Sequence, residues 1–184
     1  MAIVYYHKTI LTMLFLSAAL FAGAADEVKL PLQMANLETT FKRNCPEHIT
    51  IASQKDELVI TVGESERKSG FERTQGINLK RLAGRTFTFV IDVKLDNFAQ
   101  EGLPSNVGQI HFGDSRQLIS TKHGDWHTYL FKGVKIPGNG LLKMRISVKN
   151  VPGEIRIRNP RIRGNFPKVR DNNAKKKKKK KNKD

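Results

Sequence analysis

The sequence predicts an all-β domain, a β-sandwich or barrel of roughly nine short strands, and three observations support this fold class. Apolar and polar residues alternate over long stretches in the middle of the chain, which is the period expected of half-buried strands. Turn sequences rich in Gly, Pro, Asn and Asp separate these stretches at short intervals. No part of the chain after residue 25 keeps a helical apolar period for three turns.

The strongest strand signal is the segment 86–95, TFTFVIDVKL, in which the odd-numbered residues are all apolar and the even-numbered residues are polar except Val90. The segment 142–149, LKMRISVK, repeats this alternation, and in GEIRIRNPRIRG the residues Ile155 and Ile157 alternate with arginines. Such patterns place apolar side chains on one face of a strand and charged side chains on the other. Shorter candidate strands are 37–41, 49–52, 57–62, 109–112, 116–120 and 127–132.

The first 25 residues are nearly free of charge, with Lys8 as their one Lys or Arg. Their apolar run, Ile10 to Phe21, is shorter than the ~20 residues that span a hydrocarbon core. Small residues follow it, as they do at the cleavage site of a signal peptide. We therefore predict a signal peptide, residues 1–25, cut near Ala24 or Ala25, and a protein that is secreted, periplasmic or cell-surface associated. The alternative is an uncleaved N-terminal anchor.

The C-terminal segment 166–184 is predicted to be a disordered basic tail, because a block of like charges repels itself. It has ten basic and two acidic residues, whereas the segment 26–165, which we expect to form one domain, has 22 basic and 15 acidic residues. The tail thus accounts for half of the net charge of +16. We expect it to attach the protein to polyanions, loosely or specifically, unless it has no function. The lysines concerned are Lys175, Lys176, Lys177, Lys178, Lys179, Lys180 and Lys181.

The composition also limits the partners. A positive domain attracts polyanions at long range, and a signal peptide takes the protein away from cytoplasmic nucleic acid. We therefore expect a polysaccharide or another polyanion as partner and no specific nucleic acid. Cys45 is the only cysteine, so an intramolecular disulfide is excluded, and no second apolar segment is long enough to span a membrane. The oligomeric state stays open.

Three segments resemble the jelly-roll carbohydrate-binding modules, which have a galactose-binding-like β-sandwich fold. GFERTQGINLKRLAGRTFTFVIDVKL is similar to the segment that leads into a core strand in that group. GDWHTYLFKGVKIP resembles one of its later strands, and GLLKMRISVKNVPGEIRIRNPRIRG resembles its closing pair. The resemblance covers residues 37–163, and it implies a single jelly-roll β-sandwich with a glycan ligand.

One departure from that pattern concerns calcium. The closing strand of the group usually has a pair of aspartates, often tied to a structural calcium ion, and the matching positions here are Arg158, Asn159 and Pro160. Replacing carboxylates by Arg and Asn removes the hard oxygen ligands that Ca²⁺ prefers. We therefore expect no cofactor, and a structural calcium ion, which the resemblance leaves open, is not favoured.

A glycan-binding face needs flat aromatic rings for sugar faces and planar polar groups for hydroxyls. Trp126 and Tyr129 are the only Trp and Tyr after residue 25, and Trp126 either anchors a strand or stacks on a ligand. Arg145 lies on the polar face of one predicted strand, and Arg156 and Arg158 lie on that of the next. These arginines form either a solvated basic face or a grip for sulfate or carboxylate, which suits their planar fork. The predicted ligand-binding residues are Trp126, Tyr129, Arg145, Arg156 and Arg158.

The pairing of the last two strands affects this prediction. In a hairpin through NVPG, basic residues would lie opposite basic residues, which destabilises a sheet unless an acidic side chain or an anionic ligand offsets them. In opposite sheets, as jelly rolls often arrange consecutive strands, this conflict does not arise.

Histidines suggest an enzyme as an alternative. In HGDWH, His123 and His127 lie near Asp125 and could form a metal site, but Gly124 and Asp125 are typical of a turn, which spoils that geometry. No HExxH motif, nucleophile elbow or CxxC pair occurs. Nothing singles out two carboxylates for glycoside hydrolysis. We therefore predict neither catalytic residues nor a metal site.

Together these observations predict a secreted, non-catalytic carbohydrate-binding module, with an acidic polysaccharide as the expected ligand. One alternative is a secreted structural or protein-interaction sandwich that its lysine tail holds to an anionic cell surface. A second alternative is a small secreted glycan-active enzyme. A cluster of aromatic and planar polar side chains on a concave face would favour the first function, and its absence would favour the interaction module. A converged His/Asp or carboxylate pair would favour the enzyme.

Overall fold

The computed structural model describes residues 26–30, 32–66, 70–98, 102–122 and 124–166, so the predicted signal peptide and lysine tail lie outside the described residues. The described chain forms ten strands, one α-helix and one 3-10 helix, and it contains no helix long and apolar enough to cross a bilayer. The elements in chain order are β1 (Glu27–Lys29), α2 (Met34–Lys42), β2 (Ile49–Gln54), β3 (Glu57–Val62), β4 (Phe71–Asn78), η1 (Lys80–Leu82), β5 (Thr86–Asp96), β6 (Asn106–Phe112), β7 (Ser115–Ser120), β8 (His127–Lys135), β9 (Leu141–Val148) and β10 (Gly153–Arg163).

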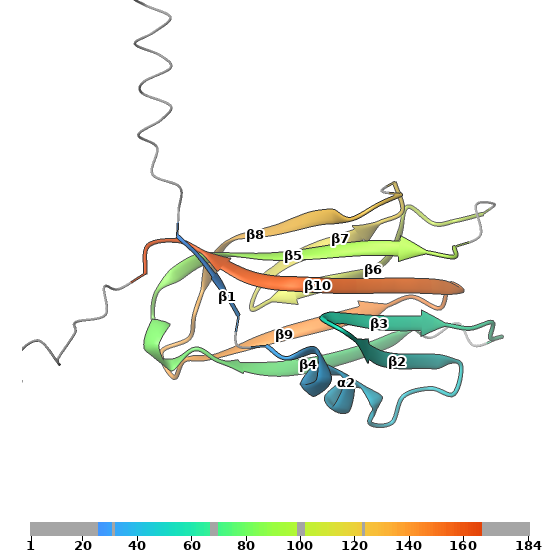
Figure 1. Cartoon of the computed structure of the whole chain (residues 1–184), viewed down its shortest axis with the longest axis horizontal. Coiled ribbons are helices and arrows are strands. Elements are labelled where there is room, and N and C mark those ends of the chain that lie inside the picture. Colours follow the sequence, from blue (N-terminus) through green and yellow to red (C-terminus); the bar gives the residue numbers. More distant parts are fainter. Residues whose placement is uncertain (1–25, 31, 67–69, 99–101, 123, 167–184) are drawn as a thin grey trace, which may run out of the picture.

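The strands form two antiparallel sheets that pack face to face as a β-sandwich, which confirms the predicted all-β fold class (Figure 1). Sheet A has the order β2-β3-β10-β5-β8, with β1 paired to β10, and sheet B has the order β4-β9-β6-β7. After β3 the chain changes sheet at every connection except the β6–β7 hairpin, as in a jelly roll. The consecutive strands β9 and β10 therefore lie in opposite sheets, and their basic faces do not oppose each other.

The core lies between the sheets and consists of the apolar residues that alternate along the strands. Phe89 of β5 stacks on Phe112 of β6 with the ring centroids 5.0 Å apart, and Phe112 meets the edge of Phe131 of β8 at 4.9 Å. Offset and edge-to-face ring pairs are favourable beyond the area they bury. Because the three rings come from both sheets, their contacts hold the two layers together.

The segment 37–41, predicted above as a strand, is part of α2, so that prediction was wrong. Leu37 and Phe41 are four residues apart and, with Met34, form the buried face of the helix. Residues with this spacing share one side of a helix, whereas a strand would have placed the polar Thr39 on the same face as Leu37 and Phe41. The alternation in this short segment was too brief to separate the two periods.

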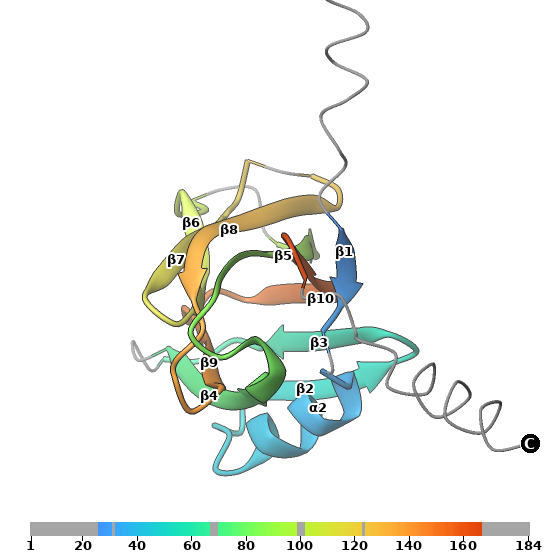
Figure 2. The same ribbon diagram turned by 90° about the vertical axis from the view of Figure 1, so that its left-hand side faces the viewer.

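Helix α2 closes one open side of the sandwich (Figure 2). It contacts β2, the edge strand of sheet A, and β4, the edge strand of sheet B. Arg73 of β4 donates hydrogen bonds to the carbonyl oxygens of Arg43 and Asn44, just beyond the end of the helix. A cation is favourable there because the helix dipole is negative at its C-terminus.

The edge strands β7 and β8 meet on the other side, where the Gln117 amide donates to the Leu130 carbonyl oxygen at 3.1 Å.

Two strands, β1 and β4, were not predicted from the sequence. β4 reads FERTQGIN, and only Phe71 and Ile77 are buried and apolar in it. Arg73 and Gln75 lie between them on the same face of the strand. Both are polar, and they face the side of the sandwich that α2 closes. With polar residues on both faces, the strand shows no alternation of hydrophobicity, so its position depends on pairing with β9.

Strand β10 contains a bulge that keeps its arginines on one face. Asn159 has φ of 50° in the left-handed region, and the pairing of β10 with β5 shifts register between Arg158 and Arg161. An extra residue in a strand reverses the side on which the following residues lie. Hence the buried residues change from odd numbers, such as Ile157, to even numbers, such as Ile162.

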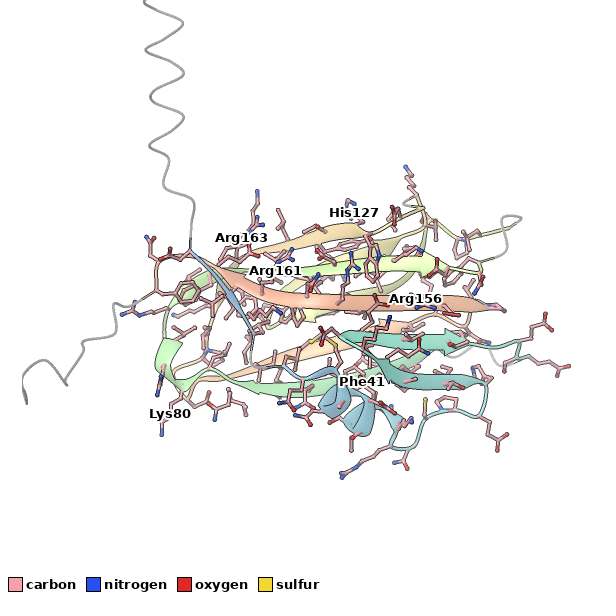
Figure 3. All side chains as sticks on the ribbon, in the orientation of Figure 1. Phe41, Lys80, His127, Arg156, Arg161 and Arg163 are labelled. Carbon is pink, nitrogen blue, oxygen red and sulfur yellow. The ribbon has the colours of Figure 1, made fainter. Side chains whose placement is uncertain are left out.

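Acidic side chains from β1, β3 and β5 pair with these arginines on the outer face of sheet A (Figure 3). Arg156 pairs with Glu154 at 2.9 Å, and Arg161 Nη2 lies 3.1 Å from Asp92 Oδ1. Asp92, 8% exposed, is the one charged residue among the buried residues of the described chain. It accepts further hydrogen bonds from the Thr128 hydroxyl at 2.9 Å and the Asn159 amide at 3.1 Å.

Replacing Asp92 by Ala should destabilise the protein by about 3–5 kcal/mol, because it removes the buried carboxylate that accepts hydrogen bonds from Arg161, Asn159 and Thr128. Urea unfolding at neutral pH measures this loss. Glu27→Gln is the matched control, since Glu27 also pairs with Arg161 but is more exposed, and its loss should cost about 1 kcal/mol or less. Equal losses for the two variants would contradict the central role of Asp92.

The carboxylate of Asp92 should also make the free energy of unfolding depend on pH in the acid range. Burial alone would raise the pKa of Asp92, but hydrogen bonds from Asn159 and Thr128 and the charge of Arg161 outweigh it, so the pKa is lowered. A group with a lowered pKa stabilises the fold above its unfolded pKa, about 3.9, and this contribution is lost as the pH falls through the folded pKa. Between pH ~5 and ~2 the free energy of unfolding should therefore fall less steeply in Asp92→Asn than in the natural protein.

Candidate ligand-binding face

The outer face of sheet B is polar, hollowed and basic. The residues that face outward are those that alternate with the buried residues of each strand. They are Glu72, Thr74, Gly76 and Asn78 from β4, Leu141, Lys143, Arg145 and Ser147 from β9, Gln109 and His111 from β6, and Arg116 and Leu118 from β7. Among these outward residues of the described chain there is no Phe, Tyr or Trp.

Two rows of side chains cross this face because the registers of the three strand pairs align. In the first, Arg145 lies directly opposite His111, and His111 lies directly opposite Arg116. We call Arg145, His111 and Arg116 the basic row. In the second, Ser147 lies between Glu72 and Gln109. The pairing of distant strands thus forms two neighbouring rows of hydrogen-bonding groups, each of which crosses three strands.

Glu72 partly neutralises one end of the basic row. Its Oε1 lies 3.5 Å from Arg145 Nη1, and its Oε2 accepts a hydrogen bond from the Ser147 hydroxyl at 2.7 Å. The Ser147 hydrogen bond and the charge of Arg145 lower the pKa of Glu72, so it is ionised at neutral pH. Within the described residues, neither Arg116 nor Lys143 forms an ion pair.

His111 lies in the middle of the basic row. Its Nδ1 is 3.5 Å from Arg145 Nη2, and its Nε2 is buried without a hydrogen-bond partner among the described residues. Burial lowers the pKa of His111, and the charges of Arg145 and Arg116 lower it further, with Glu72 opposing them. His111 is therefore neutral at neutral pH.

The face lies between two hollows, one near each end of β9. The first has a volume of about 570 Å³ and is lined by Asn106, Gln109, Leu118, Ser147 and Lys149, among others. The second has a volume of about 760 Å³ and extends from Thr74, Lys143 and Arg145 to the β6–β7 turn and the β8–β9 connection. β9 between them is eight residues long, or about 26 Å. An extended chain molecule of several units would fit along this line.

Glycines form part of the floor of the first hollow. A Cβ atom on Gly108 would lie 2.3 Å from the Ser147 carbonyl oxygen, and one on Gly70 would lie 2.2 Å from that of Val148. Only glycine permits such a close approach of two backbones. Glycine at these two positions lets the neighbouring chain pack directly against the backbone of β9.

The predicted ligand-binding residues do not form one cluster, because they are divided between the two sheets. Arg145 lies on the outer face of sheet B, whereas Arg156 and Arg158 lie on the outer face of sheet A, among acidic partners. The Arg158 guanidinium stacks on the Trp126 ring, 3.6 Å from its centroid. Tyr129 is 7% exposed, and its hydroxyl accepts a hydrogen bond from the Ser120 backbone N–H, so a surface ligand would contact little of it. Lys175–Lys181 lie outside the described residues.

Of the two histidines considered for a metal site, His127 packs on Tyr129 in sheet A, and His123 lies outside the described residues. No group of three His, Cys, Asp or Glu residues suited to a metal ion occurs in the described part of the chain. At the position matching the calcium site of the resembling modules, Asn159 and Arg161 already donate to Asp92. Two nitrogen donors in place of carboxylate ligands do not fit a calcium ion.

Sequence reasoning missed most of the basic row. The segments 109–112 and 116–120 were predicted as strands, and their alternation places His111 with Gln109 and Arg116 with Leu118. Nothing in these short segments shows that β6 pairs with β9, however. The contact between residues 34 positions apart, Arg145 and His111, depends on the sheet order.

Comparison with known proteins gives matches in structure alone. No described protein family matches the sequence, and no curated protein does. A CBM4 structure matches with 12% identity and a TM-score of 0.40, over 64% of this chain and 78% of that one. A family 29 carbohydrate-binding module from Piromyces equi matches with 14% identity and a TM-score of 0.36, over 65% and 77%. A family 11 module from Clostridium thermocellum, in complex with a β-1,3-1,4-mixed-linked tetrasaccharide, matches with 9% identity and a TM-score of 0.39, over 78% and 99%. All three are carbohydrate-binding modules, the group that the sequence motifs resemble.

Gly108→Ala should destabilise the protein by about 1–3 kcal/mol, because the new methyl group forces β6 away from the backbone of β9. Thermal or urea unfolding measures the loss. Gly138→Ala is the control, since a Cβ there meets nothing within 4 Å, and its effect should stay within about 0.5 kcal/mol. A neutral Gly108→Ala would show that the two strands can separate without cost.

Proposed function

We propose that this protein is a non-catalytic binding module for an acidic polysaccharide, which lies along the outer face of sheet B between the two hollows. The observation that supports the proposal most directly is the uncompensated positive charge of this face. Arg116, Lys143 and Arg145 face outward there, against the single acidic side chain Glu72.

The two sheets differ in how they compensate charge. The outward arginines of β10 in sheet A each have at least one acidic partner within ion-pair distance. In sheet B the neighbours of His111 across the ladder are both arginines, and burial together with their charges keeps the imidazole neutral. An anionic ligand on this face would pair with the two arginines. By the same argument β10 needs no ligand, because acidic side chains of the protein already pair with its arginines.

The chemistry of the face favours a charged glycan over a neutral one. Neutral sugars are held largely by stacking on aromatic rings, and the outward residues of sheet B contain none among the described positions. Arg, His, Gln and Glu side chains supply charge and planar hydrogen bonds instead. Carboxylate or sulfate groups along a polysaccharide present matching acceptors. The predicted signal peptide would deliver the protein to the compartment in which such polymers occur.

A second candidate function is a protein-interaction module. Leu118 and Leu141, which are 49% and 47% exposed, lie on the same face of sheet B. Exposed leucines beside charged residues are also found at protein interfaces. The lysine tail would then hold the sandwich to an anionic cell surface while this face contacts a partner protein.

The double replacement Arg116→Ala, Lys143→Ala should weaken binding to polygalacturonate about tenfold or more, since it removes two charge-assisted contacts. Isothermal titration calorimetry measures this change in affinity. Dextran serves as the neutral control polymer. Lys132→Ala is the matched control, because Lys132 is an exposed strand lysine on sheet A, and it should leave the affinity unchanged. Binding of dextran as tightly as polygalacturonate would contradict the proposal.

The lysine tail requires its own control. A chain that ends at Phe166, which stacks on Phe87 at 5.3 Å, keeps the described domain and removes the tail. It should retain polygalacturonate binding at physiological salt, where exposed charges are screened beyond ~8 Å. Binding by the full chain alone, at low salt and to every polyanion, would show that the lysines act without the sandwich. Absence of any polysaccharide binding would favour the interaction module.

A further inference from the structure

We propose that the basic row is a subsite for one anionic substituent, a carboxylate or sulfate group, and that His111 takes up a proton when this group binds. The inference rests on the proposed function, and it adds the position of the ligand's charge and a dependence of affinity on pH. Three residues from three strands form the subsite: Arg145 of β9, His111 of β6 and Arg116 of β7.

The register of sheet B fixes the dimensions of the subsite. Neighbouring strands lie about 4.8 Å apart, so the Arg145 and Arg116 backbones are about 10 Å apart with His111 midway. Both guanidinium groups are long enough to reach an anion above the imidazole. An anion in this position would face donors from both sides, and no carboxylate of the protein lies opposite His111 in the ladder.

The contact between Arg145 and His111 determines the protonation state of the free protein. An arginine N–H can only donate, so the Nδ1 atom that faces Arg145 Nη2 at 3.5 Å is the unprotonated nitrogen of the ring. A proton on Nδ1 would point at a guanidinium group. His111 can therefore gain this proton only if Arg145 turns away, and a bound anion supplies a partner for Arg145 to turn toward.

Charged groups from every strand beside β6 act on His111. Arg145 of β9 and Arg116 of β7 disfavour its charged form, while Glu72 of β4 favours it, and burial adds to the effect of the arginines. Lys143 of β9 lies along the same face, and Asp114 of the β6–β7 turn lines the second hollow beside Arg145. An anion across the row would reverse the balance, so the pKa of His111 rises on binding.

Linkage gives the sign of the pH dependence. Because the anion binds more tightly when His111 is charged, the affinity rises as the pH falls through the range in which the imidazole titrates. Each unit by which binding raises the pKa corresponds to a tenfold change in affinity across that range. For a rise of one unit from a lowered pKa, we expect the affinity to increase about three- to sixfold between about pH 7.5 and about pH 5.5, a range in which carboxylate and sulfate polymers stay ionised.

Two measurements on the full chain test the inference. In the first, the imidazole resonances of His111 are titrated by NMR without ligand and with saturating polygalacturonate, and in a parallel arm with dextran sulfate. The pKa of His111 should lie below its usual range in the free protein and rise by about one unit in the complex. The two polymers distinguish a carboxylate subsite from a sulfate subsite.

In the second measurement, the affinity for each polymer is compared at the two pH values in three proteins. The natural protein and His48→Gln should bind about three- to sixfold more tightly at the lower pH, whereas His111→Gln should lose most of this dependence. His48 is the matched control because it lies just before β2, in a hollow that Cys45 and Glu47 also line, and it is not one of the outward residues of sheet B.

The outcomes separate this inference from the proposed function. Binding of acidic polymers with an unchanged pKa of His111 and the same pH dependence in His111→Gln would overturn the subsite and leave the binding module intact. Absence of binding at both pH values would overturn both. If His111→Gln does not fold, the NMR titration of the natural protein still decides the matter.

Discussion

The ion pairs of β10 are the interaction on which the rest of the structure depends. β10 pairs with β1, β3 and β5, so it is the strand that joins most of sheet A. Its outer face has to hold Arg156, Arg158, Arg161 and Arg163, and side chains with like charge along one strand would repel each other. Acidic residues on every neighbouring strand offset this repulsion, and the bulge at Asn159 keeps the last two arginines on the same side as the first two.

This compensation distinguishes the outer faces of the two sheets in charge. The charges of β10 and β5 are paired within the protein, so the outer face of sheet A has a structural role there, including the stack of Arg158 on Trp126. The outer face of sheet B carries Arg116, Lys143 and Arg145 against Glu72 alone. It also has a hollow near each end of β9. The three basic side chains of this face are thus offset by a single acidic side chain among the described residues.

Prediction from sequence succeeded where one face of a strand is buried and the other is exposed to solvent. The segment 57–62 coincides with β3, and the alternation of 86–95 and 142–149 gives the inward faces of β5 and β9. Prediction failed for α2 itself and for β4, the edge strand of sheet B that α2 contacts. Leu37 and Phe41 satisfied both a strand and a helix period over five residues, and in β4 the inner positions Arg73 and Gln75 are polar because α2 covers them. In both places the local pattern depends on an element distant in sequence.

By itself, the sequence determined the all-β class, most strands, their inward faces and the excess of basic residues, because these depend on local alternation and on composition. The tertiary structure alone decided which charges are compensated. Arg145 and Arg156 each lie between apolar residues in a strand. The jelly-roll winding puts Arg156 beside Glu57 and Asp96, and it puts Arg145 beside His111 and Glu72. Pairing between strands distant in the chain is not encoded in the alternation of either strand, so the candidate face could be recognised only once the sheet order was known.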